Sequence, residues 1–171
     1  MLLENFRRSC YGGGSTAATM PYCVDIAGNS SNYSALSIVS NPSLAGYYSA
    51  SGYGWYVNVG FGNTPVDKSD YKLADDNIMD TQLLTYVTGA VSLASPTIRT
   101  VITTYRNDSG SAVVVKELGL VGKSYNTASQ TNRNVMIARK VLDNPITVPN
   151  GATMSFTYSI DLNFTENASA S

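Results

Sequence analysis

The chain contains no histidine, and this absence removes the side chain that most often acts as a general base or binds a transition metal. Mechanisms that need a Ser-His-Asp or Cys-His arrangement are therefore excluded. The acidic residues lie mostly in segments predicted to be turns, where aspartate serves backbone geometry. The sequence offers no motif for a pair of catalytic carboxylates, so we expect no enzymatic activity and no cofactor.

The densest group of oxygen ligands is Asp75-Asp76-Asn77 together with Asp80. Calcium takes six to eight oxygen ligands, and this group lacks the spacing and the glycine of an EF-hand loop. We interpret it as a solvated acidic turn, with a calcium site as the alternative, and we expect no metal.

Cysteine is also scarce, since the chain has only Cys10 and Cys23. A bridge between them would close a short loop around Gly12-Gly13-Gly14, whereas a reducing compartment keeps such thiols free. The N-terminus has no apolar stretch of the length of a secretory signal, which predicts synthesis in a cytoplasm and favours two free thiols.

Charge is low as well, because charged residues make up 13% of the chain and the net charge is -1. Binding to nucleic acid depends on neutralising phosphates with Lys and Arg, so we expect no nucleic-acid partner. No apolar run approaches the roughly 20 residues of a membrane span, and we expect no membrane partner.

What the chain does contain is a series of runs rich in Val, Ile, Thr, Tyr and Phe, bounded by Asn, Asp, Gly and Pro. Such runs predict antiparallel strands. They cover residues 33–40, 53–61, 83–93, 98–107, 112–121, 135–142, 146–148 and 152–162. We predict an all-β chain folded as an antiparallel β-sandwich, either a jelly roll or an immunoglobulin-like sandwich.

The residues between these runs predict the local geometry. Asp108-Ser109-Gly110-Ser111 and Pro149-Asn150-Gly151 are predicted to be hairpin turns, and Asp143-Asn144-Pro145 is predicted to separate two strands. Ser69 or Asp70 could cap one turn of helix.

Alternation within residues 55–61 places Trp55, Val57, Val59 and Phe61 on one face, which we assign to the core. The glycines of Gly60-Phe61-Gly62 are predicted to permit a tight turn. A phosphate-binding loop is disfavoured, because the segment lacks the GK[ST] ending and a strand-to-helix context.

Glu117 lies in the apolar segment VVVKELGLVG, and Arg99, Arg106 and Arg139 occur in neighbouring strand runs. Burying an unpaired charge costs several kcal/mol, so we predict that Glu117 pairs with one of these arginines. A pocket for an anionic ligand is the functional alternative.

Three segments are predicted along the chain: an extended N-terminal arm over residues 1–20, a β-sandwich domain over 21–164 and a loose tail over 165–171. Leu2, Leu3 and Phe6 are apolar anchors that could dock the arm on another subunit. Tyr47 and Tyr48 lie in a turn-rich segment, and tyrosine is enriched at interfaces, so we include both among the candidate assembly contacts.

The motifs follow one another in a familiar order. A G-x-G-x-T-P loop (60–65) precedes a D-Y-x-L segment (70–73), a strand ends in Arg106-Asn107, an E-x-G-L strand (117–120) follows, and an I-A-R strand (137–139) leads to I-T-V-P-x-G (146–151). Over residues 55–162 this order resembles small β-sandwich structural proteins and domains of tailed bacteriophages, of the tail, fibre or head-accessory type.

The resemblance implies a virion structural protein, made in the host cytoplasm, whose partners are copies of itself and other virion proteins. It carries over no catalytic residue. The alternative is a carbohydrate-binding or adhesin-like sandwich that attaches to a host-surface glycan, in which exposed Tyr47, Tyr48, Tyr53 or Trp55 would stack on sugar rings.

Overall fold

The computed structural model describes residues 22–32, 55–78, 80, 82–93, 98–126 and 131–161. These residues form the eight strands β1 (Tyr22–Val24), β2 (Ser30–Asn32), β3 (Trp55–Gly60), β4 (Leu84–Leu93), β5 (Ile98–Asn107), β6 (Val113–Asn126), β7 (Thr131–Val148) and β8 (Thr153–Asp161).

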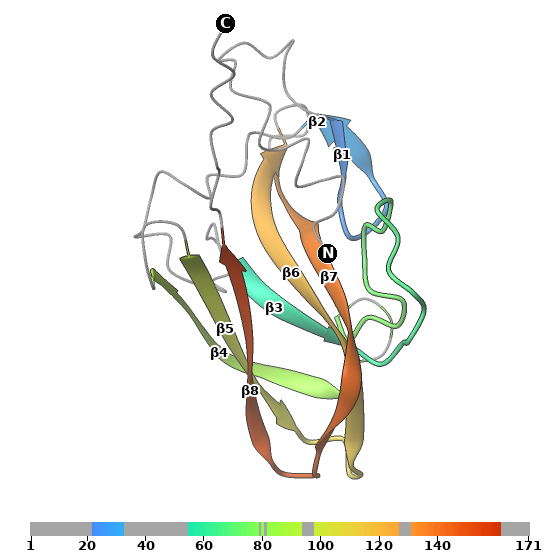
Figure 1. The fold of residues 1–171 in the computed structure, drawn as a ribbon, viewed down its shortest axis with the longest axis vertical. Coiled ribbons are helices and arrows are strands. Elements are labelled where there is room, and N and C mark those ends of the chain that lie inside the picture. The colour runs from blue at the N-terminus through green and yellow to red at the C-terminus, as the bar shows by residue number, and fades with distance from the viewer. Residues whose placement is uncertain are drawn as a thin grey trace, which may run out of the picture.

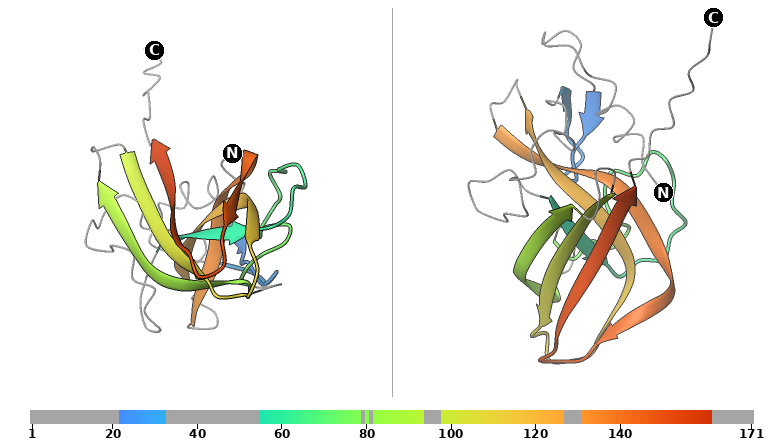
Figure 2. Two further views of the ribbon diagram at one scale, coloured as in Figure 1. Left: turned by 90° about the horizontal axis from the view of Figure 1, so that it is seen from below. Right: turned by 60° about the vertical axis from the view of Figure 1, so that its left-hand side comes forward.

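Six of the strands form two antiparallel sheets of three strands that pack together as a sandwich (Figures 1 and 2). We name each sheet by its central strand: the β6 sheet has the order β3-β6-β7, and the β5 sheet has the order β4-β5-β8. Strands β1 and β2 form a separate antiparallel pair. The predicted all-β antiparallel sandwich is confirmed.

The two turns that were predicted to make hairpins instead connect the sheets. Strand β5 pairs with β4 and β8, and β6 pairs with β3 and β7, so the turn at residues 108–111 passes from one sheet to the other. The turn at 149–151 does the same between β7 and β8. Gly110 and Gly151 have positive φ of 89° and 77°, as expected for glycines in tight turns. The predicted pairing of the flanking strands as hairpins is wrong.

These two turns lie side by side at one end of the sandwich (Figure 1). The backbone N–H of Gly110 donates to Oδ1 of Asn150 at 2.9 Å. Buried Asn107 donates through Nδ2 to the main-chain oxygens of Ser111 and Val148, both at 2.8 Å. One asparagine side chain thus holds the ends of both sheets together.

Strand β7 is continuous through Asp143-Asn144-Pro145, where a break was predicted. The residues are accommodated by a shift in register, because Val115 pairs with Ile146 while Glu117 pairs with Val141. Proline cannot donate to a sheet ladder, and it is tolerated here in an edge strand at a bulge.

The core between the sheets consists of the facing residues of both. Val57 and Val59 of β3 are fully buried, and Trp55 and Phe61 are half-buried and pack against the same cluster, which confirms the predicted core face. The buried members of this cluster are Val57, Val59, Leu84, Val101, Tyr105, Val113, Val115, Leu118, Leu120, Val135, Ile137, Ala138, Val148, Phe156 and Ile160.

A second, smaller core lies on the opposite face of the β6 sheet. Leu73 from the segment after β3 packs there with Ile26, Tyr56, Val121 and Met136. Residues 117–122 of β6 are therefore buried on both faces of the sheet, which accounts for the mostly apolar sequence there.

The helical turn predicted near Ser69 is not observed in residues 61–78, which follow an irregular path across this face. The part of the chain that the structure describes contains no helix long and apolar enough to cross a membrane.

Candidate functional site

The clearest polar centre is the ion pair between Glu117 of β6 and Arg139 of β7, which lie on adjacent strands. Nη2 of Arg139 is 2.7 Å from Oε2 of Glu117, and the two side chains are 2% and 0% exposed. The predicted pair is confirmed, with Arg139 as the partner. Arg106 instead forms an exposed pair with Asp108 at 2.8 Å, and the Arg99 side chain lies outside the described part.

Backbone N–H groups complete the environment of the Glu117 carboxylate. Oε1 accepts from Gly62 at 3.2 Å and Asp75 at 3.0 Å, and Oε2 accepts from Ala74 at 3.3 Å and from Nε of Arg139 at 2.8 Å. Gly62, in the segment weighed above as a phosphate-binding loop, therefore donates to a carboxylate of the same chain, together with Ala74 and Asp75.

Gly60 and Gly62 are required by this close approach. A Cβ on Gly60 would lie 2.7 Å from Cγ of Glu117, and one on Gly62 would lie 2.8 Å from Oε1. Neither glycine is among the described residues with positive φ. Glycine is thus needed at both positions because there is no room for a side chain beside Glu117, and not because of the turn conformation that was predicted.

Arg139 extends the same centre to the loop surface. Nη1 donates to Oδ2 of Asp70 at 2.6 Å, and Nη2 donates to the main-chain oxygen of Thr64 at 2.9 Å. Burial disfavours the charged guanidinium, but hydrogen bonds and attraction from Asp70 and Glu117 outweigh this, so the pKa of Arg139 is raised. The centre fastens residues 62–75 to the β6 sheet.

The acidic segment after this loop is partly buried, which corrects the interpretation of a solvated turn. Asp76 is fully buried and accepts hydrogen bonds from Nδ2 of Asn58 and N–H of Ile78, both at 2.8 Å. Asp80 is exposed, as expected, and bonds Lys72 at 3.0 Å. Hydrogen bonds from the backbone of Asp76 and from Lys72 lower the pKa of Asp80.

The same bond to Asp80 raises the pKa of Lys72. Within the described ranges, no group of three His, Cys, Asp or Glu side chains is arranged to hold a metal ion.

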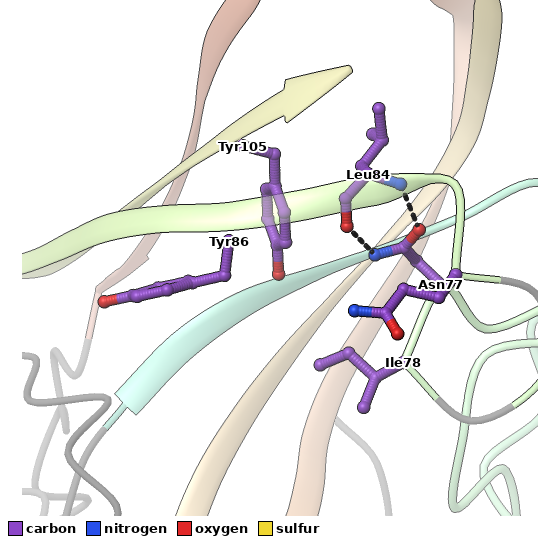
Figure 3. Close-up of a pocket in the computed structure, with 6 residues that line it drawn as sticks. Asn77, Ile78, Leu84, Tyr86 and Tyr105 are labelled. Carbon is purple, nitrogen blue, oxygen red and sulfur yellow. Dashed lines mark hydrogen bonds between the residues drawn. The ribbon is translucent and has the colours of Figure 1, made fainter. Parts of the chain in front are cut away.

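A shallow recess of about 210 Å³ lies beside the start of β4 (Figure 3). It is lined by Asn77, Ile78, Gln82, Leu84, Tyr86 and Tyr105. Its size is below the roughly 300 Å³ at which ligand pockets begin. The Asn77 side chain bonds both backbone groups of Leu84 at 2.8 Å, and the rings of Tyr86 and Tyr105 meet edge to face at 6.3 Å. The side chain of Asn77 and the hydroxyl of Tyr105 are therefore engaged within the fold.

The free edge of β3 is closed by side chains of the β5 sheet, by the side chain of Asn58 in β3 itself and by the backbone of Asn77. Val57 donates its N–H to Oγ1 of Thr103 at 2.7 Å and accepts from the hydroxyl of Tyr105 at 2.9 Å. Val59 donates to Oδ1 of Asn58 at 2.9 Å and accepts from the N–H of Asn77 at 3.1 Å. This edge has no free backbone groups at Val57 and Val59.

The outer face of the β5 sheet is a regular array of small hydroxyl side chains. The register places Thr88, Thr104 and Ser155 in one row across the three strands, and Thr100 and Ser159 in another. Hydroxyl groups bond across the rows, at 2.8 Å between Thr104 and Ser155 and at 3.0 Å between Thr100 and Ser159. The sequence signal for this face is Thr or Ser at alternate positions of β8, which sequence reasoning missed. The same face of β5 alternates Thr100 and Thr104 with Ile102 and Arg106.

The predicted assembly contacts Leu2, Leu3, Phe6, Tyr47 and Tyr48 lie outside the described residues, as do the arm, the tail, Cys10 and Tyr53. The side chain of Cys23 also lies outside the part of the chain that the structure describes. Comparisons of the chain with protein-family models, with curated proteins and with solved structures found no match.

Proposed function

We propose that the chain is a structural protein of a bacteriophage virion, in the tail, neck or fibre or as a capsid accessory, that acts by self-assembly and by docking to other virion proteins. It is made in the host cytoplasm and has no catalytic activity or cofactor. The order of the turn and strand motifs over residues 55–162 supports this proposal, and so does the antiparallel sandwich into which these motifs fold.

The observation that carries the proposal is the contrast between the two sheets. On the β6 sheet, Arg139 donates to both Glu117 and Asp70, and these contacts fasten a loop. On the β5 sheet, the outer face consists mainly of Thr and Ser side chains, with Arg106 at one end. The centres of protein interfaces are depleted in charged residues and also in serine, so it is the low charge of this face, and not its hydroxyl groups, that suits it to contact with another protein.

The proposal is tested by the composition of purified particles. Virions of the source phage, separated on a density gradient and digested, should yield peptides of this chain in a fixed ratio to a major virion protein. Absence of the chain from intact particles, together with its presence in the soluble fraction of the lysate, would contradict a structural role in the virion.

A further inference from the structure

We propose that two copies of this chain associate through β8, by antiparallel pairing of β8 with the β8 strand of the second copy. This inference rests on the proposed self-assembly and names the surface that performs it. A strand at the edge of a sheet presents unpaired N–H and C=O groups, and proteins normally protect such edges with charge, proline, bulges or a covering segment. The four edge strands of the sandwich differ in this protection.

Three of the four edges carry protective features. Strand β3 is closed at Val57 and Val59 by Thr103, Tyr105 and Asn77. Strand β7 contains Pro145, two shifts of register and several charged residues. Strand β4 has an irregularity between Tyr86 and Thr88, and Asn77 bonds the backbone of Leu84 at its start.

Strand β8 carries none of these features. Its sequence TMSFTYSID has no proline and no charged residue before Asp161. It pairs with β5 over nine consecutive residues without a shift of register. In the part of the chain that the structure describes, β8 has a backbone partner on its β5 side only. Its opposite edge therefore offers a straight row of backbone groups for another strand.

The sequence of β8 is complementary to itself in the antiparallel sense. With a two-fold axis at Thr157, the centre of the strand, Ser155 faces Ser159 of the second copy on the outer face. On the inner face, Phe156 then faces Tyr158 and Met154 faces Ile160. Every one of these pairs joins side chains of the same kind, and such isologous contacts are how two-fold dimers form.

Pairing of this kind would continue features already present in one copy. The hydroxyl rows that join Thr104 to Ser155 and Thr100 to Ser159 would extend across the axis, and the two β5 sheets would become one sheet of six strands. A second copy is favoured over an unrelated strand because both members of the contact then have the same uncharged, regular edge.

The register of the proposed pair can be tested by introducing charged residues at Ser155 and Ser159, whose side chains are exposed. In S155K/S159K, lysines would face each other twice across the axis, and like charges placed directly opposite destabilise strand pairing. In S155K/S159E, each lysine would face a glutamate. The double lysine variant should raise the dissociation constant of the dimer about tenfold or more, and the lysine-glutamate variant should restore it.

The matched control is T88K/A90K. Thr88 and Ala90 are exposed positions on the outer face of the opposite edge strand, β4, and the control changes the net charge by the same amount as S155K/S159K. We expect it to leave the dimer intact. Circular dichroism and urea unfolding of each variant would verify that the sandwich is folded. The molar mass of each variant in solution, measured by light scattering across a concentration series, then gives the dissociation constant of the dimer.

The outcomes separate this inference from the proposed function. Loss of the dimer in S155K/S159K with recovery in S155K/S159E supports the β8 pair. Equal loss in T88K/A90K, no loss in S155K/S159K, or a wild-type chain that is monomeric at every concentration overturns it. Detection of the chain in purified virions would in each of these cases leave the proposed function standing, with a different surface or partner.

Discussion

The hydroxyl group of Tyr105, in the β5 sheet, donates a hydrogen bond of 2.9 Å to the main-chain oxygen of Val57, in the β6 sheet. Both residues are almost completely buried. Together with the bond from the N–H of Val57 to Thr103, this contact closes the β3 edge with side chains of the other sheet. The packing of the sandwich and the protection of one of its edges therefore depend on the same residues.

Tyr105→Phe should lower the free energy of unfolding by about 1–3 kcal/mol, because it leaves the buried oxygen of Val57 without a donor. Urea unfolding measures this difference. Tyr71→Phe is the control, since the Tyr71 side chain is exposed and removal of its hydroxyl should change stability by about 0.5 kcal/mol or less. Equal effects of the two substitutions would contradict the assigned role of Tyr105.

Arg139→Met should lower the free energy of unfolding by about 3–5 kcal/mol, because the Glu117 carboxylate would remain buried without its cation. Arg106→Met provides a matched comparison, since Arg106 also pairs with a carboxylate, but both side chains are at least half exposed. Exposed pairs contribute about 0–1 kcal/mol. A similar loss in both variants, measured by urea unfolding, would show that the buried centre does not fasten the loop.

Gly60→Ala should be more destabilising than Gly110→Ala, although only Gly110 has a positive φ. A methyl group on Gly60 would lie 2.7 Å from Cγ of Glu117 and 2.8 Å from the main-chain oxygen of Asp75. A methyl group on Gly110 would have no heavy atom of the described residues within 4 Å, apart from the adjacent residues of the chain. Overpacking costs about 1–3 kcal/mol and occasionally more, and the left-handed conformation costs roughly 1–2 kcal/mol.

Thermal unfolding of both glycine variants checks this order. If Gly60→Ala were as stable as the wild type, the close contact between β3 and the Glu117 side chain would not be a constraint on the fold.

Alkaline pH should destabilise the protein in part through Tyr158, because burial raises the pKa of its phenol. Below about pH 10 the phenol is neutral in the folded and unfolded states, and its contribution to stability is fully present. As the pH rises, the unfolded phenol ionises first, so stability is lost until the pH passes the folded pKa.

The loss should be smaller in Tyr158→Phe than in the wild type, when both are unfolded in urea at pH 8 to 11. Parallel declines in stability for the two proteins would show that Tyr158 does not contribute to the alkaline transition.

Strands β3 to β8 were predictable, but their pairing was not, and β1 and β2 were not predicted at all. The sequence around Gly110 and Gly151 correctly indicates tight turns, and the same turn residues serve a hairpin or a connection between sheets. Which of the two forms depends on the faces that the flanking strands bury. The break predicted at Pro145 was wrong for a similar reason, because an edge strand with a bulge can include a proline.

The polar centre was predictable in part. A glutamate in an apolar strand requires a partner, which is why an arginine could be expected beside Glu117. The choice of Arg139 over Arg106 depends on which strands are adjacent. The role of Gly60 and the burial of Asp76 depend on contacts between segments far apart in the sequence, and alternation along a single strand does not reveal them.

The molar mass in solution, measured by light scattering across a concentration series, tests self-association most directly. One chain has a mass of 18.2 kDa. Association through β8 predicts a defined assembly with an even number of chains that dissociates on dilution. A mass of 18.2 kDa at every concentration would contradict self-assembly as the activity of the isolated chain.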